Sequence, residues 1–215
     1  IGLAVFLTEL SPKKLSQVFS SLIDLIAAIP SVIIGLWGIF ILAPFIREYI
    51  QPLLRTLSFI PLFQGETQGL CYLNAILVLI FMITPIMTSI FTEAFRNVPR
   101  DLKEALYALG GTRYEVIKHV SIPHTRTALL AGTVLAYGRA LGETLAVTMV
   151  IGNKPNITIS LLNPGYTLAA VIANEFLEAT DALYVSALIA LGLILFIISL
   201  IVNLIGALLL RRLSK

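Results

Sequence analysis

NVPRDLKEALYALGGTRYEVIKHVSIPHTR, residues 97–126, is the one long polar interval in a chain that is otherwise largely apolar. Pro99 stands where a helix can begin. The residues after it include apolar side chains at the i, i+3, i+4, i+7 spacing of an amphipathic helix, namely Leu102, Ala105, Leu106 and Leu109. Gly110 and Gly111 are expected to end this helix. The pattern therefore predicts a short helix with one apolar stripe.

A second short helix is predicted directly after the two glycines. Thr112 and Glu115 have the spacing of a capping box, and Pro123 is expected to close the helix. Long uncharged runs flank this helix pair on both sides, so the pair must lie at a membrane surface. Its apolar stripe is then free for another protein, and we interpret the pair as a docking element.

The same stretch resembles the EAA loop of ABC-importer permeases. That loop has the pattern Glu-Ala-Ala-x-x-x-Gly, then nine residues, then Ile-x-Leu-Pro, and the spacing here is the same. Leu106 replaces the second alanine, Val120 the isoleucine and Ile122 the leucine. In that family the loop is the coupling helix, which fits a groove on a cytoplasmic ATPase. The resemblance implies an ATPase-coupling role for Glu104, Ala105, Leu106, Gly110 and Pro123, within a coupling loop over residues 97–126.

The composition is that of an integral membrane protein. Apolar residues make up 58% of the chain and charged residues 13%, with a mean hydropathy of +0.94, whereas a soluble domain has about 25% charged residues. Cys71 is the single cysteine, so an internal disulfide is excluded and a structural role is expected. Because Ile1–Thr8 is only a short piece of an apolar helix, we expect the chain to begin part-way into a span.

Four apolar runs are long enough to cross a bilayer at about 20 residues per crossing. We expect an all-α helical bundle forming a single transmembrane domain over residues 1–215. A kink is predicted at Pro30, and a polar loop over Arg47–Gln68. The predicted spans are Leu25–Ile46, Thr67–Thr92, Thr127–Ile151 and Ala182–Leu210.

The basic residues predict an orientation. If residues 97–126 are cytoplasmic, only Arg47, Arg55 and Lys154 lie on the outer side. This asymmetry agrees with the positive-inside rule and places the C-terminus in the cytoplasm. The inner group is Lys13, Lys14, Arg96, Arg100, Lys103, Arg113, Lys118, Arg126, Arg211, Arg212 and Lys215.

Two charges interrupt the third predicted span. Arg139 and Glu143 are four residues apart, so on one helix they would share a face and reach each other. A charge at the bilayer centre costs about 2.5 to 3.5 kcal/mol. One interpretation is a structural ion pair, with Asp24 as a candidate third member and membrane counter-ion. The other is that Arg139 lines the transport path, because a guanidinium offers bidentate donors to an anion such as phosphate.

A second resemblance bears on this choice. The segment RALGETLAVTMVIGN, from Arg139 to Asn153, resembles the corresponding helix of phosphate-specific permeases of the PstC type, and Ile29–Gly38 resembles an earlier span. The resemblance implies a type I, MetI-like ABC-importer permease in a prokaryotic inner membrane, with Arg139 and Glu143 in the path of inorganic phosphate. The partners that it implies are a second, PstA-like permease, a cytoplasmic ATPase dimer, a periplasmic phosphate-binding protein and membrane lipid. It also implies that ATP and Mg²⁺ bind to the ATPase and that this chain holds no cofactor.

Other function classes remain as alternatives or are disfavoured. The same fold could carry molybdate, sulfate or an amino acid, and an ATP-independent transporter or channel is a more distant alternative. A DNA-binding helix-turn-helix is disfavoured by the flanking spans, and His119 and His124 lack a third metal ligand at a useful spacing. The sequence contains no G-x-x-x-x-G-K-[ST], G-x-S-x-G or H-E-x-x-H motif. We therefore predict that this chain is not an enzyme and that another chain hydrolyses ATP.

Overall fold

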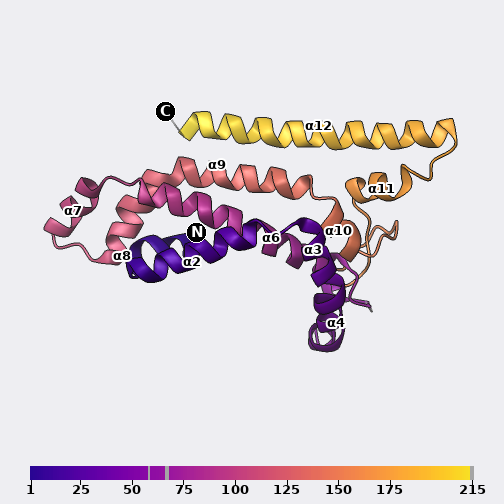
Figure 1. Cartoon of the computed structure of the whole chain (residues 1–215), viewed down its shortest axis with the longest axis horizontal. Helices are drawn as coiled ribbons and strands as arrows, with labels where there is room; N and C mark the ends of the chain where they lie inside the picture. Colours follow the sequence, from indigo (N-terminus) through magenta and orange to yellow (C-terminus); the bar gives the residue numbers. More distant parts are fainter. Residues whose placement is uncertain (58, 66–67, 214–215) are drawn as a thin grey trace. The chain divides into compact units, whose positions relative to one another are not determined.

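The computed structural model describes residues 1–57, 59–65 and 68–213, which form helices and connecting loops without a β-strand. Thr67 and Lys215, which belong to the predicted second span and basic tail, lie outside these residues. Contacts divide the chain into a first unit (1–28, 83–139 and 201–215) and a second unit (29–82 and 140–200). Continuous helices run from one unit to the other (Figure 1). The single domain over residues 1–215 stays a prediction.

The first unit packs around two phenylalanines of α6. Phe91 and Phe95 are fully buried and lie with Ala4 and Leu129 in one apolar cluster. Gly132 permits this packing, because a Cβ there would lie 2.9 Å from the Phe91 ring. The elements of this unit are α1 (Gly2–Val5), η1 (Phe6–Leu10), α2 (Lys13–Ala27), the end of α6 (Tyr72–Arg96), α7 (Arg100–Ala108), α8 (Arg113–Val116), η5 (Ile117–Ser121), α9 (Ile122–Leu141) and the end of α12 (Ala182–Leu213).

The second unit packs α3 against α10 and the start of α6. Gly35 and Gly38 make the close approach possible: a Cβ on Gly38 would lie 2.6 Å from Val150 Cγ1. Cys71 is fully buried in the same core, as expected of a structural cysteine. The remaining elements are α3 (Ser31–Trp37), η2 (Gly38–Leu42), α4 (Ala43–Phe45), η3 (Ile46–Ile50), α5 (Gln51–Arg55), η4 (Pro61–Phe63), α10 (Leu145–Val150) and α11 (Leu168–Glu175).

The N-terminus of α6 is satisfied by backbone from distant loops. The amide of Tyr72 donates to Asn163 O at 3.1 Å, and that of Leu73 donates to Leu161 O at 2.8 Å. These bonds occupy N–H groups that have no partner inside a helix. Asn74, fully buried one position further on, donates to Gly38 O and Gly69 O. The loop that contains Leu161 and Asn163 and the loop that contains Gly69 are thus both fixed to the start of α6.

Short π-helical turns accompany four of the prolines. In each turn the residue just before the proline donates its N–H five residues back, as Ile122 does to Ile117 O. Proline has no N–H, and its ring clashes with the carbonyl four residues earlier, so a wider turn relieves the clash. The helix continues past three of these prolines, whereas it ends at Ser11, before Pro12. The turns are Phe6–Leu10 before Pro12, Gly38–Leu42 before Pro44, Ile46–Ile50 before Pro52 and Ile117–Ser121 before Pro123.

Among the described residues, three helical stretches are long and apolar enough to cross a membrane: Ser31–Arg55, Tyr72–Arg96 and Ala182–Arg211. The last two agree with the predicted spans. The first corrects two expectations. Pro30 precedes α3 at its N-cap and does not kink a span, and the helix continues to Arg55, where a loop was predicted from Arg47. The π turns allow this helix to pass Pro44 and Pro52.

Candidate functional site

The loop over residues 97–126 begins as the sequence predicts. Pro99 is the N-cap of α7, and Gly110 follows the helix with a φ of +85°, a conformation that glycine adopts without strain. Thr112 and Glu115 form the capping box: the Thr112 hydroxyl accepts from the Glu115 amide, and the Glu115 carboxylate accepts from the Thr112 amide at 2.7 Å. The Thr112 hydroxyl also donates to the Glu115 carboxylate at 2.8 Å, and the two bonds donated by the Thr112 amide and hydroxyl hold the pKa of Glu115 below its ordinary value.

The second half of the loop differs from the prediction at Pro123. We expected this proline to close the second short helix, but α8 passes through η5 into α9 and ends only at Leu141. The wider turn over Ile117–Ser121 removes the clash of the Pro123 ring with the preceding carbonyl. The loop therefore consists of the short helix α7 and the first turns of a long helix that begins with α8.

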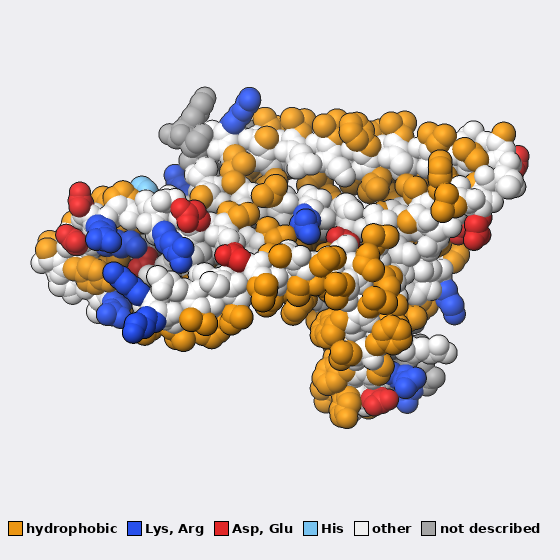
Figure 2. Space-filling model, in the orientation of Figure 1, with side chains coloured by type: hydrophobic (Ala, Val, Ile, Leu, Met, Phe, Trp, Pro, Cys, Tyr) orange, Lys and Arg blue, Asp and Glu red, His pale blue; other side chains and the backbone are white. Residues whose placement is uncertain are grey.

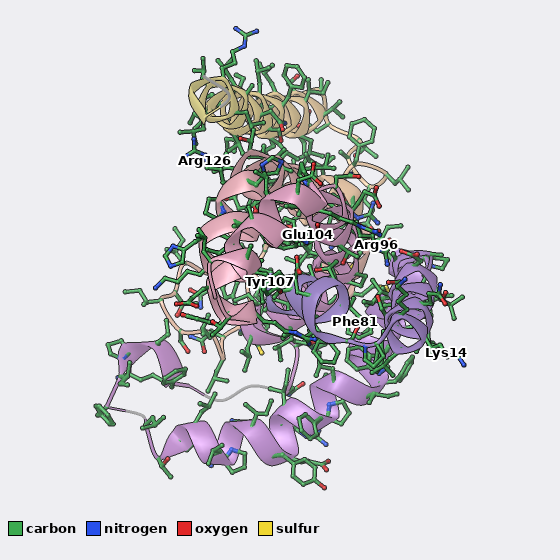
Figure 3. The ribbon with its side chains drawn as sticks, turned by 90° about the vertical axis from the view of Figure 1, so that its left-hand side faces the viewer. Lys14, Phe81, Arg96, Glu104, Tyr107 and Arg126 are labelled. Carbon is green, nitrogen blue, oxygen red and sulfur yellow. The ribbon has the colours of Figure 1, made fainter. Side chains whose placement is uncertain are left out.

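The apolar stripe of α7 is uncovered. Leu102 is 45% exposed and Leu109 84% exposed, Glu104 and Ala105 are exposed, and Leu106 is half-buried. Figure 2 shows Lys and Arg side chains gathered around this end of the unit, and Figure 3 looks onto it, with Glu104 labelled on α7. An amphipathic helix that leaves its apolar face in solvent has the form of a surface for another protein.

A partly buried ion pair holds α7 to the unit. Lys103 Nζ lies 2.6 Å from Glu9 Oε1, and the two side chains are 20% and 11% exposed. The same oxygen accepts a hydrogen bond from Ser121 Oγ at 3.0 Å. Glu9 thus connects η1, α7 and η5. The sequence gives no signal for this contact apart from the Glu9 carboxylate near the end of an otherwise apolar segment, Gly2–Leu10.

The chain does not place Arg139 and Glu143 on one helix. Helix α9 ends at Leu141, and α10 begins at Leu145, so the predicted span Thr127–Ile151 is broken between them. Glu143 Oε1 accepts from the Ala146 amide at 3.4 Å, which caps the start of α10. Gly142, which has a low helix propensity, stands at the break between the two helices. The expected shared helix face was wrong.

Glu143 lines a cavity of about 240 Å³ within the second unit. Its other walls are mainly apolar and come from α6, α11 and α12, so the half-buried carboxylate is the charged group among the residues that line the cavity. Arg139, in the first unit, is exposed and makes no hydrogen bond or ion pair with any residue that the structure describes. The roles of both residues in a substrate path stay predictions.

Asp24 lies in a separate polar cavity of about 260 Å³ in the first unit. Glu93 and Arg96 of α6 also line it, and the guanidinium of Arg96 donates to Ser20 Oγ at 3.3 Å. Asp24 makes no ion pair within the described part of the chain. Its role as a membrane counter-ion also stays a prediction.

Long apolar helices and an uncovered amphipathic helix are typical of a membrane protein that docks on a partner protein. The chain belongs to the family of binding-protein-dependent transport system inner membrane components, whose model matches residues 1–215. It is therefore a multi-pass inner-membrane component of a transport system. The predicted ABC-importer permease fold is confirmed.

Relatives and solved structures agree with this family. The chain is 47% identical to the phosphate transport system permease protein PstC of Mesorhizobium japonicum and 48% identical to that of Xylella fastidiosa, in each case over 100% of this chain and 67% of the relative. A probable phosphate transport system permease protein PstC of Methanocaldococcus jannaschii is 45% identical over 97% of this chain and 67% of the relative. A chain of the inward-facing MetNI methionine ABC transporter shares the fold, with a TM-score of 0.69 at 16% identity, covering 100% of this chain and 85% of that one.

Proposed function

We propose that the chain is a permease subunit of an ATP-driven importer and carries inorganic phosphate across the inner membrane. The main support is the identity of 47% and 48%, along the whole chain, to permeases whose names specify phosphate transport. The residues that resemble phosphate permeases, Arg139–Asn153, also surround the polar break between α9 and α10. Molybdate, sulfate and amino acids are accordingly less favoured as substrates.

The energy for transport comes from a partner. The uncovered stripe of α7 has the size and amphipathic character for a groove on a cytoplasmic ATPase dimer, which binds ATP and Mg²⁺. The importer further contains a second, PstA-like permease and a periplasmic phosphate-binding protein. The end of the chain that carries α7 faces the cytoplasm, together with the C-terminus, in agreement with the positive-inside rule.

Arg139 and Glu143 act on the ion in transit. Arg139 is exposed and unpaired within the described part of the chain, so its guanidinium is available to donate two parallel hydrogen bonds to phosphate oxygens. Glu143 accepts hydrogen bonds only. Phosphate near neutral pH still carries a proton to donate to it, whereas sulfate carries none. Arg139 therefore attracts the anion, and Glu143 adds a modest preference for phosphate over sulfate. The periplasmic partner makes the main selection of the substrate.

The test is uptake of radiolabelled phosphate by the complete transporter in proteoliposomes, with the Arg139→Gln variant. Glutamine keeps donors but removes the charge, so we expect uptake to fail while the partner subunits still co-purify. Arg126→Gln is a matched control, because Arg126 is an exposed arginine near the start of the same helix (Figure 3). Normal uptake by Arg139→Gln, or loss of the whole complex, would make Arg139 a structural residue.

A further inference from the structure

A second cavity in the first unit lies against the base of α7. It measures about 370 Å³ and is lined by η1, the start of α2, the end of α6 and the start of α7. Four cationic side chains from three helices line it: Lys13, Arg96, Arg100 and Lys103. Among the described residues of its lining there is no carboxylate. The cavity is thus strongly positive and separate from the break at Arg139 and Glu143.

Only two of the four cations have a polar partner among the described residues, and only one of these partners is an anion. Lys103 is paired with Glu9, and Arg96 donates to Ser20. Lys13 and Arg100 are exposed and make no hydrogen bond or ion pair with any described residue. Glu9 does not compensate them, because its single negative charge is already paired with Lys103. Asp101, in the first turn of α7, is the nearest acid in sequence, but it does not line the cavity.

The helix ends add to the positive potential. Lys13 and Arg100 are the first residues of α2 and α7, and the N-caps Pro12 and Pro99 provide no side-chain acceptor. A cation at a helix N-terminus opposes the helix dipole, so both positions are unfavourable unless an anion lies nearby. The start of each helix also presents backbone N–H groups without an intrahelical partner.

One buried polar group points to a ligand. Ser16 lines the cavity and is only 8% exposed, yet its hydroxyl makes no hydrogen bond with any residue in the described part of the chain. The Ser16 hydroxyl is open to the cavity, so an occupant with acceptor oxygens can accept a hydrogen bond from it. Ser16 lies one turn after Lys13, so a single group can meet both side chains.

We propose that this cavity binds a phosphate group, either as a free phosphate ion or as the headgroup of an anionic phospholipid. A phosphate offers several acceptor oxygens and a negative charge for Lys13 and Arg100, the two cations without a partner among the described residues, and the two arginines suit its geometry. The cavity lies beside Arg96, the last residue of the spanning helix α6, and therefore at the level where a bilayer places its headgroups. Lys103 lines the cavity, so the occupant acts directly on the ion pair that holds α7.

If the proposed function is correct, the free ion would be the imported product, bound next to the helix that contacts the ATPase. The cavity would then sense the cytoplasmic phosphate concentration. If a lipid is bound, the same contacts would anchor α7 to the membrane surface. The two sources share their chemistry and differ in the probe that detects them.

The test uses the complete transporter in phosphatidylcholine nanodiscs. Two probes are titrated separately: radiolabelled inorganic phosphate, and phosphatidylglycerol added to the bilayer and counted by mass spectrometry of the retained lipid. The variant is Lys13→Gln combined with Arg100→Gln, whose side chains are exposed and unpaired, so folding does not depend on them. The control is Arg113→Gln combined with Lys118→Gln, which removes the same charge from the same unit outside the cavity.

We expect the Lys13 and Arg100 double variant to bind one of the two probes about tenfold more weakly or worse, with the control unchanged. The probe that responds identifies the source. Equal binding of both probes by the two double variants would overturn the proposal, as would the absence of saturable binding in the unmodified transporter. Phosphate binding at the substrate path contributes equally to both double variants, so it cancels in the comparison. Phosphate uptake is measured in its own assay, so a failure of the proposed function is distinguished from a failure of this proposal.

Discussion

The ion pair between Glu9 and Lys103 allows a quantitative prediction. Glu9→Gln removes the charge from a carboxylate that is 11% exposed and accepts hydrogen bonds from Lys103 and Ser121. A hydrogen bond to a charged group contributes about 1.5 to 3 kcal/mol net. Glutamine retains a neutral acceptor, and Lys103 is exposed enough to reach water, so we take about 2 kcal/mol as the loss. The docked state of α7 should then be disfavoured about 30-fold.

Hydrogen exchange of the assembled transporter measures this effect directly. The amides of α7 should exchange about 30-fold faster in Glu9→Gln, with the amides of α12 unchanged. Ser121→Ala removes one neutral hydrogen bond of about 1 kcal/mol and should accelerate exchange by only about fivefold. The number of ATP molecules hydrolysed per phosphate transported should rise in both variants, and more in Glu9→Gln than in Ser121→Ala. Unchanged exchange in Glu9→Gln, or a larger effect of Ser121→Ala, would refute the reasoning.

Three further substitutions test other parts of the account. Leu106→Asp places a charge on the apolar stripe of α7 and should detach or uncouple the ATPase; normal substrate-stimulated hydrolysis and uptake would contradict this. Glu143→Gln should lower the ratio of phosphate flux to sulfate flux, measured without the periplasmic partner and with a constitutively active ATPase. An unchanged ratio would show that Glu143 does not discriminate between the two ions. Gly38→Ala puts a methyl group 2.6 Å from Val150 Cγ1 and should destabilise the chain by about 1 to 3 kcal/mol in thermal unfolding. Gly2→Ala, with nothing within 4 Å of the new methyl group, should not.

Local sequence signals predicted the first half of the coupling loop well. The end of α7 at Gly110 and the capping box of Thr112 and Glu115 depend on residues within one or two turns of each other, so the sequence contains all the necessary information. The spans over Tyr72–Arg96 and Ala182–Arg211 were also predictable, because hydrophobic length alone determines them.

Proline and polar residues inside apolar runs were harder to interpret. Pro123 was expected to end a helix, but a π turn lets the chain continue, and nothing in the local sequence distinguishes the two outcomes. Arg139 and Glu143 have the spacing of a helical pair, yet the chain leaves the helix at Gly142 and Glu143 caps the next one. The competing cap was not recognised from the spacing.

The contacts of Glu9 with Lys103 and Ser121, which hold the coupling loop to the unit, could not be predicted from the sequence. Glu9 and Ser121 are separated by 112 positions, and their hydrogen bond exists only because η1 and η5 pack together. Lys103 had been counted only as a basic residue of the cytoplasmic side. Long-range polar contacts of this kind need the fold, since no periodicity links their members.

A cross-linking measurement tests the central claim that the exposed stripe of α7 docks on the ATPase that drives transport. Leu109→Cys adds a thiol at a position that is 84% exposed, and Cys71, the native cysteine, is fully buried and should not react. With a short thiol-to-amine cross-linker, the assembled transporter should give one covalent product between this chain and the ATPase. The yield of this product should change when ATP binds. If the thiol introduced by Leu109→Cys reacts with the cross-linker but forms no product with a co-purified ATPase, the account is contradicted.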